Sequence, residues 1–453
     1  MQDYDLVIVG AGSGNMLPTS DTENWRIAIV ESDRFGGTCL NRGCIPSKMF
    51  VYAADVAEQV RHAARFGISA EIIGVDWPSI RERVFGRIDP IHDRAVEYRR
   101  HSGVDVYLGQ ARFVADKTLD IDGTVIHGKR IVLAVGSRPS VPDIAGLGDV
   151  IHHTSDTIMR LDQLPGSMLV VGGGFIGAEM SHVFGALGTH VTIVHRGESL
   201  LNSHDHDIRR RFTDMYAQRF DLRLGSRVER VERRGSGVVA HLRSGDGAAS
   251  TVTADVVLLA TGRVPNSDLL DPTAGGLTVD EHGHIRTDDT YATSAAGVWA
   301  IGDTANHFQL KHMANAETRL VRHNLLHPDK PERARFDVVP SAVFADPQVA
   351  TVGVTEDQLR SDGRDYVVGA RDYSDTAYGW ALEDTTSFAK VLADPKSRKL
   401  LGAHILGPQA ATLIQPLIQA MCLANTVDQL AHDVLYIHPA LSEVVENALL
   451  QIP

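Results

Sequence analysis

The sequence predicts an α/β protein with two similar Rossmann-like folds and a C-terminal α+β region. Two observations support this. A glycine-rich turn follows an apolar strand twice, at residues 5–15 and 167–179, and apolar alternation typical of strands recurs at 340–354 and 386–407. After the last of these strands, residues 410–423 are expected to form a helix. An apolar run that ends in glycines and leads to a second apolar run is typical of a βαβ unit. With 453 residues, the chain is long enough for about three domains.

The first glycine turn lies in DLVIVGAGSGN, residues 5–15. Its glycines are Gly10, Gly12 and Gly14. Such glycines let the backbone approach a pyrophosphate at a helix N-terminus, and an acid at the end of the next strand, here Glu31, binds a ribose hydroxyl pair. The fit is imperfect, because Asn15 holds the third glycine position and Pro18 falls where the helix should continue.

The second turn shows the complete G-x-G-x-x-G pattern. Its glycines are Gly172, Gly174 and Gly177. The next strand, HVTIVHR, ends on His195 and Arg196 instead of an acid. A cation at this point accommodates a 2′-phosphate, whereas an acid selects a free 2′-hydroxyl. The second fold is therefore predicted to prefer NADPH over NADH, the alternative being that Arg196 is only a solvated surface cation.

Cys39 and Cys44 lie in GGTCLNRGCIPSK, residues 36–48, at the start of a helical pattern that continues from Met49. A zinc site would need two more soft ligands, and Cys422 is the only other thiol. Helix N-termini and nearby cations lower a cysteine pKa and so favour the thiolate. The pair is predicted to be a redox-active dithiol, the alternative being two buried cysteines that pack as small apolar side chains. No metal is expected.

Composition excludes several partners. The formal net charge of −13 disfavours nucleic acid, which needs clustered Lys and Arg. No run of 18 apolar residues is present that could span a membrane. The N-terminus, MQDYD, carries acids where a secretory signal would carry cations, so a cytoplasmic location is expected.

Taken together, these segments resemble the pyridine nucleotide-disulfide oxidoreductases along the whole chain. Further motifs that carry the resemblance are RIVLAVGSRP at 130–139, VVLLATGRVPN at 256–266, GVWAIGD at 297–303 and HPALSE at 438–443. The resemblance implies FAD in the first fold and NADPH in the second. With the changes of pattern along the chain, it predicts an FAD-binding domain at 1–152 and 267–331, an NAD(P)H-binding domain at 153–266 and a dimerisation domain at 332–453.

The resemblance also implies roles for particular residues. Lys48 and Glu179 would form an ion pair beside the isoalloxazine, Asp303 would contact the ribityl or phosphate part of FAD, and Phe175 would gate the nicotinamide pocket. The dithiol would lie on the opposite flavin face, with Cys44 nearest the ring. The cofactor-binding residues implied are Gly10, Gly12, Gly14, Glu31, Gly37, Thr38, Lys48, Gly136, Gly172, Gly174, Phe175, Gly177, Arg196, Gly262, Gly302 and Asp303.

An acid–base pair is predicted at His438 and Glu443, which a Pro439 turn separates. A carboxylate that holds one ring nitrogen leaves the other free to exchange a proton near neutral pH. The resemblance implies that this histidine reaches the partner subunit's dithiol. A homodimer, in which each active site needs two chains, follows from that.

Within the family, the branch that reduces mycothione, the disulfide of mycothiol, is favoured by four segments. These are KMFVYAADVAEQVR, VFGRIDPI, YGWALEDT and HPALSEVVENALL. Two departures from the family pattern stand out. Arg42 lies between the cysteines where valine is common, and is expected to add a cation beside the thiolate. Asn202 stands where NADPH-selective relatives often place a second arginine, which weakens the preference for NADPH.

Three other functions fit part of this pattern. A dihydrolipoamide dehydrogenase would share every catalytic residue but use NAD⁺, and Arg196 counts against it. A mercuric or high-molecular-weight thioredoxin reductase would need an extra C-terminal redox pair, which ALLQIP lacks. A flavin-binding protein without activity would not need the dithiol, the lysine–glutamate pair and the histidine–glutamate pair together. His204 to Asp207, His312 and Cys422 are assigned no catalytic role.

Overall fold

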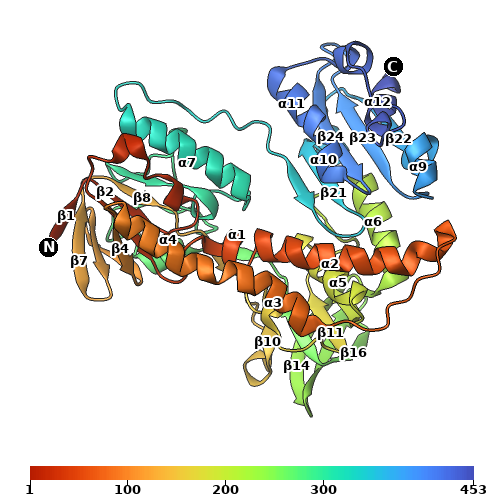
Figure 1. Ribbon diagram of the computed structural model, residues 1–453, viewed down its shortest axis with the longest axis horizontal. Helices are drawn as coiled ribbons and strands as arrows, with labels where there is room; N and C mark the ends of the chain where they lie inside the picture. Colours follow the sequence, from red (N-terminus) through yellow and green to blue (C-terminus); the bar gives the residue numbers. More distant parts are fainter.

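The first sheet of the computed structural model, which describes residues 1–453, has five parallel strands (Figure 1). Their order is β19-β8-β2-β3-β4, with bounds β2 Leu6–Val9, β3 Ile27–Glu31, β4 Asp105–Leu108, β8 Ile131–Leu133 and β19 Val298–Ala300. All four residues of the central strand β2 are buried. A continuous apolar strand is expected in a parallel sheet that is covered on both faces.

Different elements cover the two faces of this sheet. On one face, helices α4 (Pro90–His101) and α7 (Lys311–Leu326) pack on Leu6 and Ile8 of β2. On the other face, Val7 and Val9 pack against a small sheet of order β1-β7-β6-β5. Its strands are β1 Gln2–Tyr4, β5 Ala111–Ala115, β6 Thr118–Ile121 and β7 Thr124–Gly128. β2 is therefore held rigidly below the first glycine turn.

The helix expected after the first glycine turn is absent. The chain instead forms two short 3₁₀ turns, η1 (Gly14–Met16) and η2 (Ser20–Thr22), before β3 begins. Pro18, between the two turns, has no amide proton to continue a helix. Gly14 allows close packing, because a Cβ there would lie 2.8 Å from Cγ2 of Ile8. The pyrophosphate turn of the first fold thus lacks the helix N-terminus that the sequence pattern predicted.

The second sheet is again parallel, with the order β10-β17-β11-β12-β13. Its strands are β10 His152–His153, β11 Ser167–Val171, β12 His190–Val194, β13 Asp221–Arg223 and β17 Val256–Leu259. Helix α5 (Phe175–Ala186) begins directly after Gly174, and α6 (His206–Arg219) follows β12. An antiparallel meander adds β14 Ser226–Arg234, β15 Gly237–Ser244 and β16 Ala249–Ala254. We propose the predicted domain limits, whose first boundary, between residues 152 and 153, falls within the two-residue β10.

Two helical segments connect the sheets. α1 (Gly37–Asn41) and the long α2 (Cys44–His62) run between the second sheet and the C-terminal unit (Figure 1). Phe50 of α2 stacks on Trp77 of α3 (Trp77–Ile88), and Trp77 in turn contacts Phe184 of α5. All three rings are buried. Burying a ring of this size contributes about 1.5–3 kcal/mol to stability, so α2 is firmly fixed between the two folds.

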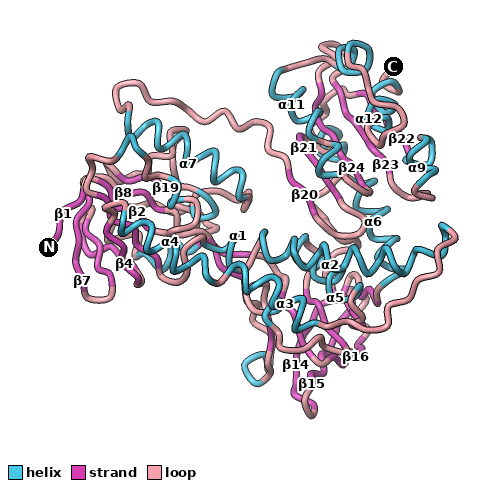
Figure 2. The backbone as a smooth tube through the Cα atoms, viewed as in Figure 1, coloured by secondary structure: helices cyan, strands magenta, loops and turns pink.

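The C-terminal unit is an antiparallel sheet of order β20-β21-β24-β23-β22 with helices on it, joined to α7 by a long loop (Figure 2). Its strands are β20 Ser341–Val343, β21 Val349–Gly353, β22 Val367–Asp372, β23 Phe388–Ala393 and β24 Leu400–Leu406. Its helices are α8 Glu356–Ser361, α9 Ala377–Ala381, α10 Ala410–Leu413, α11 Gln415–Leu423 and α12 Glu443–Leu450. The single helix predicted over residues 410–423 is two helices, because Pro416 near the start of α11 has no amide proton for the helix hydrogen bond.

The four consecutive polar residues at 204–207 help to fix the C-terminal unit. Asp205 and Asp207 bind the buried ammonium of Lys390, at 2.8 and 2.7 Å, and Glu356 completes the cluster at 2.6 Å. These acids therefore join α6 to β23 and α8. None of the helices is both long and apolar enough to cross a membrane.

Candidate active site

A cavity of about 1330 Å³ lies where the two parallel sheets and the C-terminal unit meet. It is lined by thirteen of the predicted site residues: Gly10, Gly12, Glu31, Gly37, Thr38, Cys39, Cys44, Lys48, Gly136, Phe175, Glu179, Gly302 and Asp303. Eight others lie outside it: Gly14, Gly172, Gly174, Gly177, Arg196, Gly262, His438 and Glu443. The structure thus brings the dithiol, the lysine–glutamate pair and the first glycine turn into one space.

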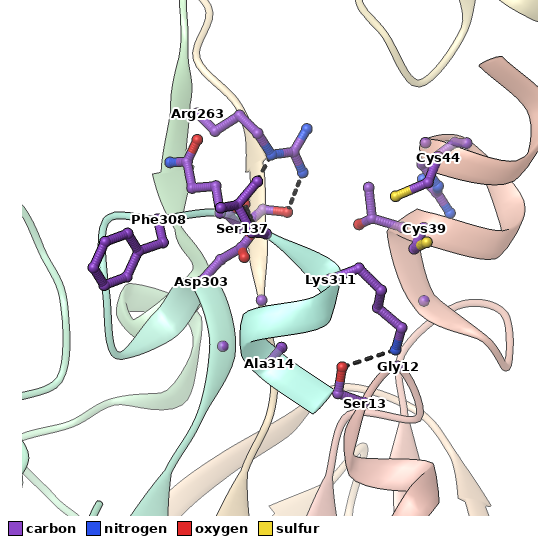
Figure 3. A pocket seen from close by; sticks show the side chains of 18 of the residues that line it. Gly12, Ser13, Cys39, Cys44, Ser137, Arg263, Asp303, Phe308, Lys311 and Ala314 are labelled. Atoms are coloured by element: carbon purple, nitrogen blue, oxygen red, sulfur yellow. Dashed lines mark hydrogen bonds between the residues drawn. The ribbon is translucent and has the colours of Figure 1, made fainter. Parts of the chain in front are cut away.

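The two thiols sit on consecutive helical segments at one side of this cavity (Figure 3). Cys39 lies in α1, and Cys44 is the first residue of α2; both are free thiols. The buried Asn41 ties the segment together, because its side-chain amide donates to the carbonyls of Phe35 and Gly37, each at 3.0 Å. The bonds from Asn41 to the backbone therefore hold in place the segment that carries both cysteines.

The local environment makes Cys44 the thiolate of the pair. A hydrogen bond from the Cys39 thiol lowers the pKa of Cys44 to about 7, and the ammonium of Lys48 acts in the same direction. The same hydrogen bond, with burial, raises the pKa of Cys39. Cys44 also begins α2, where free amides favour a negative charge. One proton is thus held on Cys39 and the charge on Cys44.

Lys48 and Glu179 form an ion pair across α2 and α5, with Nζ and Oε2 2.5 Å apart. The other carboxylate oxygen of Glu179 accepts a hydrogen bond from the amide of Phe344 at 2.9 Å. The Lys48 ammonium lies over the Phe344 ring, 4.6 Å from its centre. The pair therefore holds one ammonium at the cavity wall and also joins both folds to the C-terminal unit.

The charge of Arg42, which the sequence places between the two cysteines, is shared with two carboxylates. Its guanidinium forms ion pairs with Asp33 and with Asp156, the latter at 3.4 Å. These two carboxylates compensate the positive charge, and an effect of Arg42 on the thiolate stays a prediction. The cations that act on the thiols are Lys48 for Cys44 and Lys311 for Cys39.

His438 and Glu443 form a close pair far from the thiols along the chain. Nδ1 of His438 lies 2.6 Å from Oε1 of Glu443, the first residue of α12. The carboxylate is mostly buried, whereas 71% of the histidine side chain is exposed. The ring therefore presents its other nitrogen to the outside of its own subunit, and it does not line the cavity of the same chain.

Family models match almost the whole chain. The model described as pyridine nucleotide-disulphide oxidoreductase matches residues 4–318, and the model of the dimerisation domain of that family matches residues 339–449. The chain belongs to the pyridine nucleotide-disulphide oxidoreductase family. With the dithiol in its cavity, it is a flavoprotein disulfide reductase, and the dimerisation domain indicates a homodimer.

Individual relatives agree with this family. The chain is 48% identical over 461 residues to the mycothione reductase of Mycobacterium tuberculosis, with 99% of each chain covered. It is 31% identical to a glutathione reductase of Burkholderia cepacia, covering 97% of both chains. Among solved structures, the HOCl-induced flavoprotein disulfide reductase RclA of Escherichia coli superposes with a TM-score of 0.88 at 28% identity, covering 99% of this chain and 100% of that one.

Membership of the family implies FAD and a pyridine nucleotide as cofactors, and the first glycine turn fits an extended dinucleotide. Gly10 has a φ of +104°, and a Cβ there would lie 2.2 Å from the carbonyl oxygen of Ala134. A Cβ on Gly37 would lie 2.8 Å from Cα of Gly12, so the two backbones form a narrow cradle. Glu31 accepts a hydrogen bond from the amide of Ala11 at 2.7 Å. These residues present amides and a carboxylate to the same cavity wall.

The second glycine turn fits a nicotinamide dinucleotide in the usual way. Gly174 precedes α5 and has open space around it, so the free amides of the helix are accessible. Phe175 lines the cavity and is 44% exposed, between this turn and the thiols. Arg196 is exposed beyond the end of β12, and Asn202 contacts the neighbouring His195 ring at 3.1 Å.

Several residues that line the cavity were not predicted from the sequence as site residues. Arg263 donates to the Oγ and carbonyl oxygen of Ser137, at 2.8 and 2.6 Å, and Ser137 donates to Asp303 at 2.6 Å. Arg263 lies within the GRVPN motif, which could have signalled it. Lys311 donates to Ser13, 298 positions away along the chain, and no local pattern pointed to that contact.

Proposed function

We propose that this chain reduces mycothione with electrons from NADPH. The observation that carries the proposal is the 48% identity to a mycothione reductase across 99% of both chains. The match extends over the C-terminal unit as well as over the two folds that carry the glycine turns. The cavity supports the reaction class, because it holds a dithiol whose charge is localised on Cys44. A reducing compartment such as the cytoplasm fits this activity.

Bound FAD would pass two electrons from the reduced pyridine nucleotide to the Cys39–Cys44 disulfide. For the flavin, we propose the first glycine turn with Glu31 and Asp303 as the binding residues. The Lys48 ammonium, held by Glu179, would lie beside the ring and stabilise Cys44 as a thiolate. Phe175 would cover the nicotinamide pocket, and the second glycine turn would bind the nucleotide phosphates.

Reduction of the substrate then proceeds by thiol–disulfide exchange. The partner's His438, oriented by the partner's Glu443, takes the proton that Cys39 keeps, and the resulting Cys39 thiolate attacks one sulfur of the substrate, so that a mixed disulfide forms and the first thiolate leaves. The same histidine then gives that proton to the leaving thiolate. Cys44 attacks the sulfur of Cys39, which releases the second thiolate to take a proton from solvent and restores the Cys39–Cys44 disulfide. Two electrons are consumed for each disulfide reduced.

The homodimer is proposed to complete each active site. His438 is exposed on its own subunit, and the segment before it exposes apolar side chains: Leu435 is 97% exposed and Ile437 is 75% exposed. Exposed apolar residues next to a polar, oriented histidine are typical of a surface that a partner covers. The partner's His438 is therefore placed by the same surface that joins the subunits.

The substrate proposal is tested by a turnover panel. Disulfides of mycothiol, glutathione, coenzyme A and lipoamide are each assayed with NADPH and with NADH, and kcat/KM is compared. Mycothione with NADPH is expected to give the highest value. Preference for lipoamide with NAD⁺ in the reverse direction would instead assign the chain to the dihydrolipoyl dehydrogenases, one of which is 32% identical to this chain.

Arg196→Leu is expected to raise the KM for NADPH about tenfold while leaving the KM for NADH nearly unchanged, because a charge-assisted contact to the 2′-phosphate is lost. Initial rates at varied nucleotide concentration measure the effect. Arg227→Leu is the matched control, since Arg227 is a 71% exposed arginine of β14. Equal changes for both nucleotides would refute a role in phosphate recognition.

The charge of Cys44 is expected to titrate near neutral pH. Because its pKa is lowered to about 7, the thiolate is present above that pH and is lost as the pH falls below it. In the two-electron-reduced protein, the long-wavelength absorbance of a thiolate beside oxidised flavin should therefore fall with a midpoint near pH 7. A midpoint near the ordinary thiol value of 9 would show that Cys39 and Lys48 do not stabilise this thiolate.

A further inference from the structure

The first glycine turn lacks a source of positive charge that the second turn has. In the second fold, the twelve-residue α5 begins directly after Gly174, and its N-terminus attracts phosphate. In the first fold, only the three-residue η1 follows the glycines. A dinucleotide diphosphate carries two negative charges wherever it binds. The first fold needs a cation from another part of the chain.

Six lysine and arginine side chains line the cavity: Arg34, Arg42, Lys48, Arg138, Arg263 and Lys311. Four of them form ion pairs, which are Arg34–Asp89, Arg42–Asp33, Lys48–Glu179 and Arg138–Asp268. Arg263 has no carboxylate in salt-bridge range, but its guanidinium is occupied by two hydrogen bonds to Ser137. Lys311 forms no salt bridge either; the negative charges that act on it are those of the two cysteines and Asp303, and its ammonium contacts none of them through a hydrogen bond.

The ammonium of Lys311 lies at the first glycine turn. Lys311 is the first residue of α7, and its side chain reaches across the cavity to Ser13, next to Gly12 (Figure 3). Nζ donates to the Ser13 hydroxyl at 2.8 Å, its one hydrogen-bond acceptor in the protein. An ammonium has three protons to donate, so two remain available. Burial lowers the pKa of Lys311, and the charges of Cys39, Cys44 and Asp303 offset this only in part.

A second cation braces the same turn from outside the cavity. Arg99 of α4 donates from Nε to the side-chain oxygen of Asn15 at 2.7 Å and also binds the Asn15 carbonyl. Asn15 occupies the position of the third glycine in the usual pattern. The turn is thus held by α4 on one side and by α7 on the other, which replaces the mechanical support of the missing helix.

We propose that Lys311 is the counter-ion of the FAD diphosphate in this chain and takes over the electrostatic role of the missing helix N-terminus. This rests on FAD as the resident cofactor of the first fold. When FAD is bound, the Lys311 ammonium would donate a hydrogen bond to a phosphate oxygen beside the glycine turn, in addition to or in place of its bond to Ser13. The expected consequence concerns affinity for the cofactor, with no change in the chemistry of the flavin ring.

The test measures FAD binding by the full-length homodimer after the flavin has been removed by dialysis at high bromide concentration. Quenching of FAD fluorescence gives the Kd, and competition by ADP, which has the diphosphate without the flavin, gives a second value. Lys311→Met is expected to weaken both ligands about 10- to 100-fold, as for loss of a charge-assisted hydrogen bond. Lys311→Arg should stay within a few-fold of wild type. Lys129→Met, which removes an exposed cation of the same domain, should have no effect.

Three results would overturn the proposal. An unchanged Kd for FAD in Lys311→Met would show that no charge is needed at the turn. Weaker FAD binding with unchanged ADP competition and a lower flavin reduction potential would place Lys311 at the ring. Equal weakening in Lys311→Arg would indicate a packing role. Lys311→Gln, whose neutral amide can still donate a hydrogen bond, provides the same comparison where the Met variant is not dimeric. The titrations measure binding of FAD and ADP, so they can be interpreted even if the protein does not reduce mycothione.

Discussion

Cys39→Ser is expected to retain bound FAD and to lose disulfide reduction, with kcat falling at least about a thousandfold, because the serine hydroxyl cannot form the mixed disulfide. The reason is structural as well as chemical. Cys39 is the sulfur on α1, half-exposed in the cavity, and it is the one that keeps its proton while Cys44 carries the charge. Flavin absorbance after gel filtration measures retention, and NADPH consumption with mycothione measures turnover.

The third cysteine gives a matched control for this experiment. Cys422 lies in α11, is exposed and does not line the cavity, so Cys422→Ser should behave as wild type. Turnover near the wild-type rate in Cys39→Ser would refute the exchange scheme. Loss of FAD from Cys39→Ser would show that the loop between Gly36 and Gly43 also holds the cofactor, and the loss of activity could not then be assigned to sulfur chemistry.

The parallel sheets could be predicted from the sequence because their strands are short, continuous apolar runs next to glycine turns. β2 and β11 are of this kind, and each is buried almost throughout. The helix predicted after the first turn is absent from the structure. The glycine pattern favoured a helix there, and Pro18 is the residue that argued against it. In the same way, apolar periodicity outweighed Pro416, so that one helix was predicted where α10 and α11 are separate.

The candidate site could likewise be predicted only in part from the sequence. Cys39, Cys44 and Lys48 could be found together because they lie within ten residues on one segment. Contacts between distant segments had no local signal: Arg42 turns towards Asp156, and Lys311 reaches Ser13 from α7. The sequence showed which residue types were present, but side-chain direction depends on the counter-charges that folding brings near. Arg42 forms ion pairs with two such carboxylates, whereas Lys311 forms none and contacts the Ser13 hydroxyl instead.

His438→Gln is expected to lower kcat for disulfide reduction at least about a hundredfold while NADPH still reduces the flavin, because proton transfer to the leaving thiol is lost. The imidazole is held by Glu443 at 2.6 Å, so the substitution removes an oriented acid. Stopped-flow absorbance separates flavin reduction from steady-state turnover. His432→Gln changes an exposed histidine in the preceding segment and should have no effect.

Mixed dimers decide whether this histidine acts across the interface. If each site uses Cys39 of one chain and His438 of the other, a dimer of one Cys39→Ser chain and one His438→Gln chain contains one site with both changes and one intact site. Random exchange of subunits between the two inactive variants should therefore restore about a quarter of wild-type activity. If both residues acted within one chain, every site in the mixture would carry a change and no activity would return. Recovery of activity is thus a direct measure of whether the active site is shared between subunits.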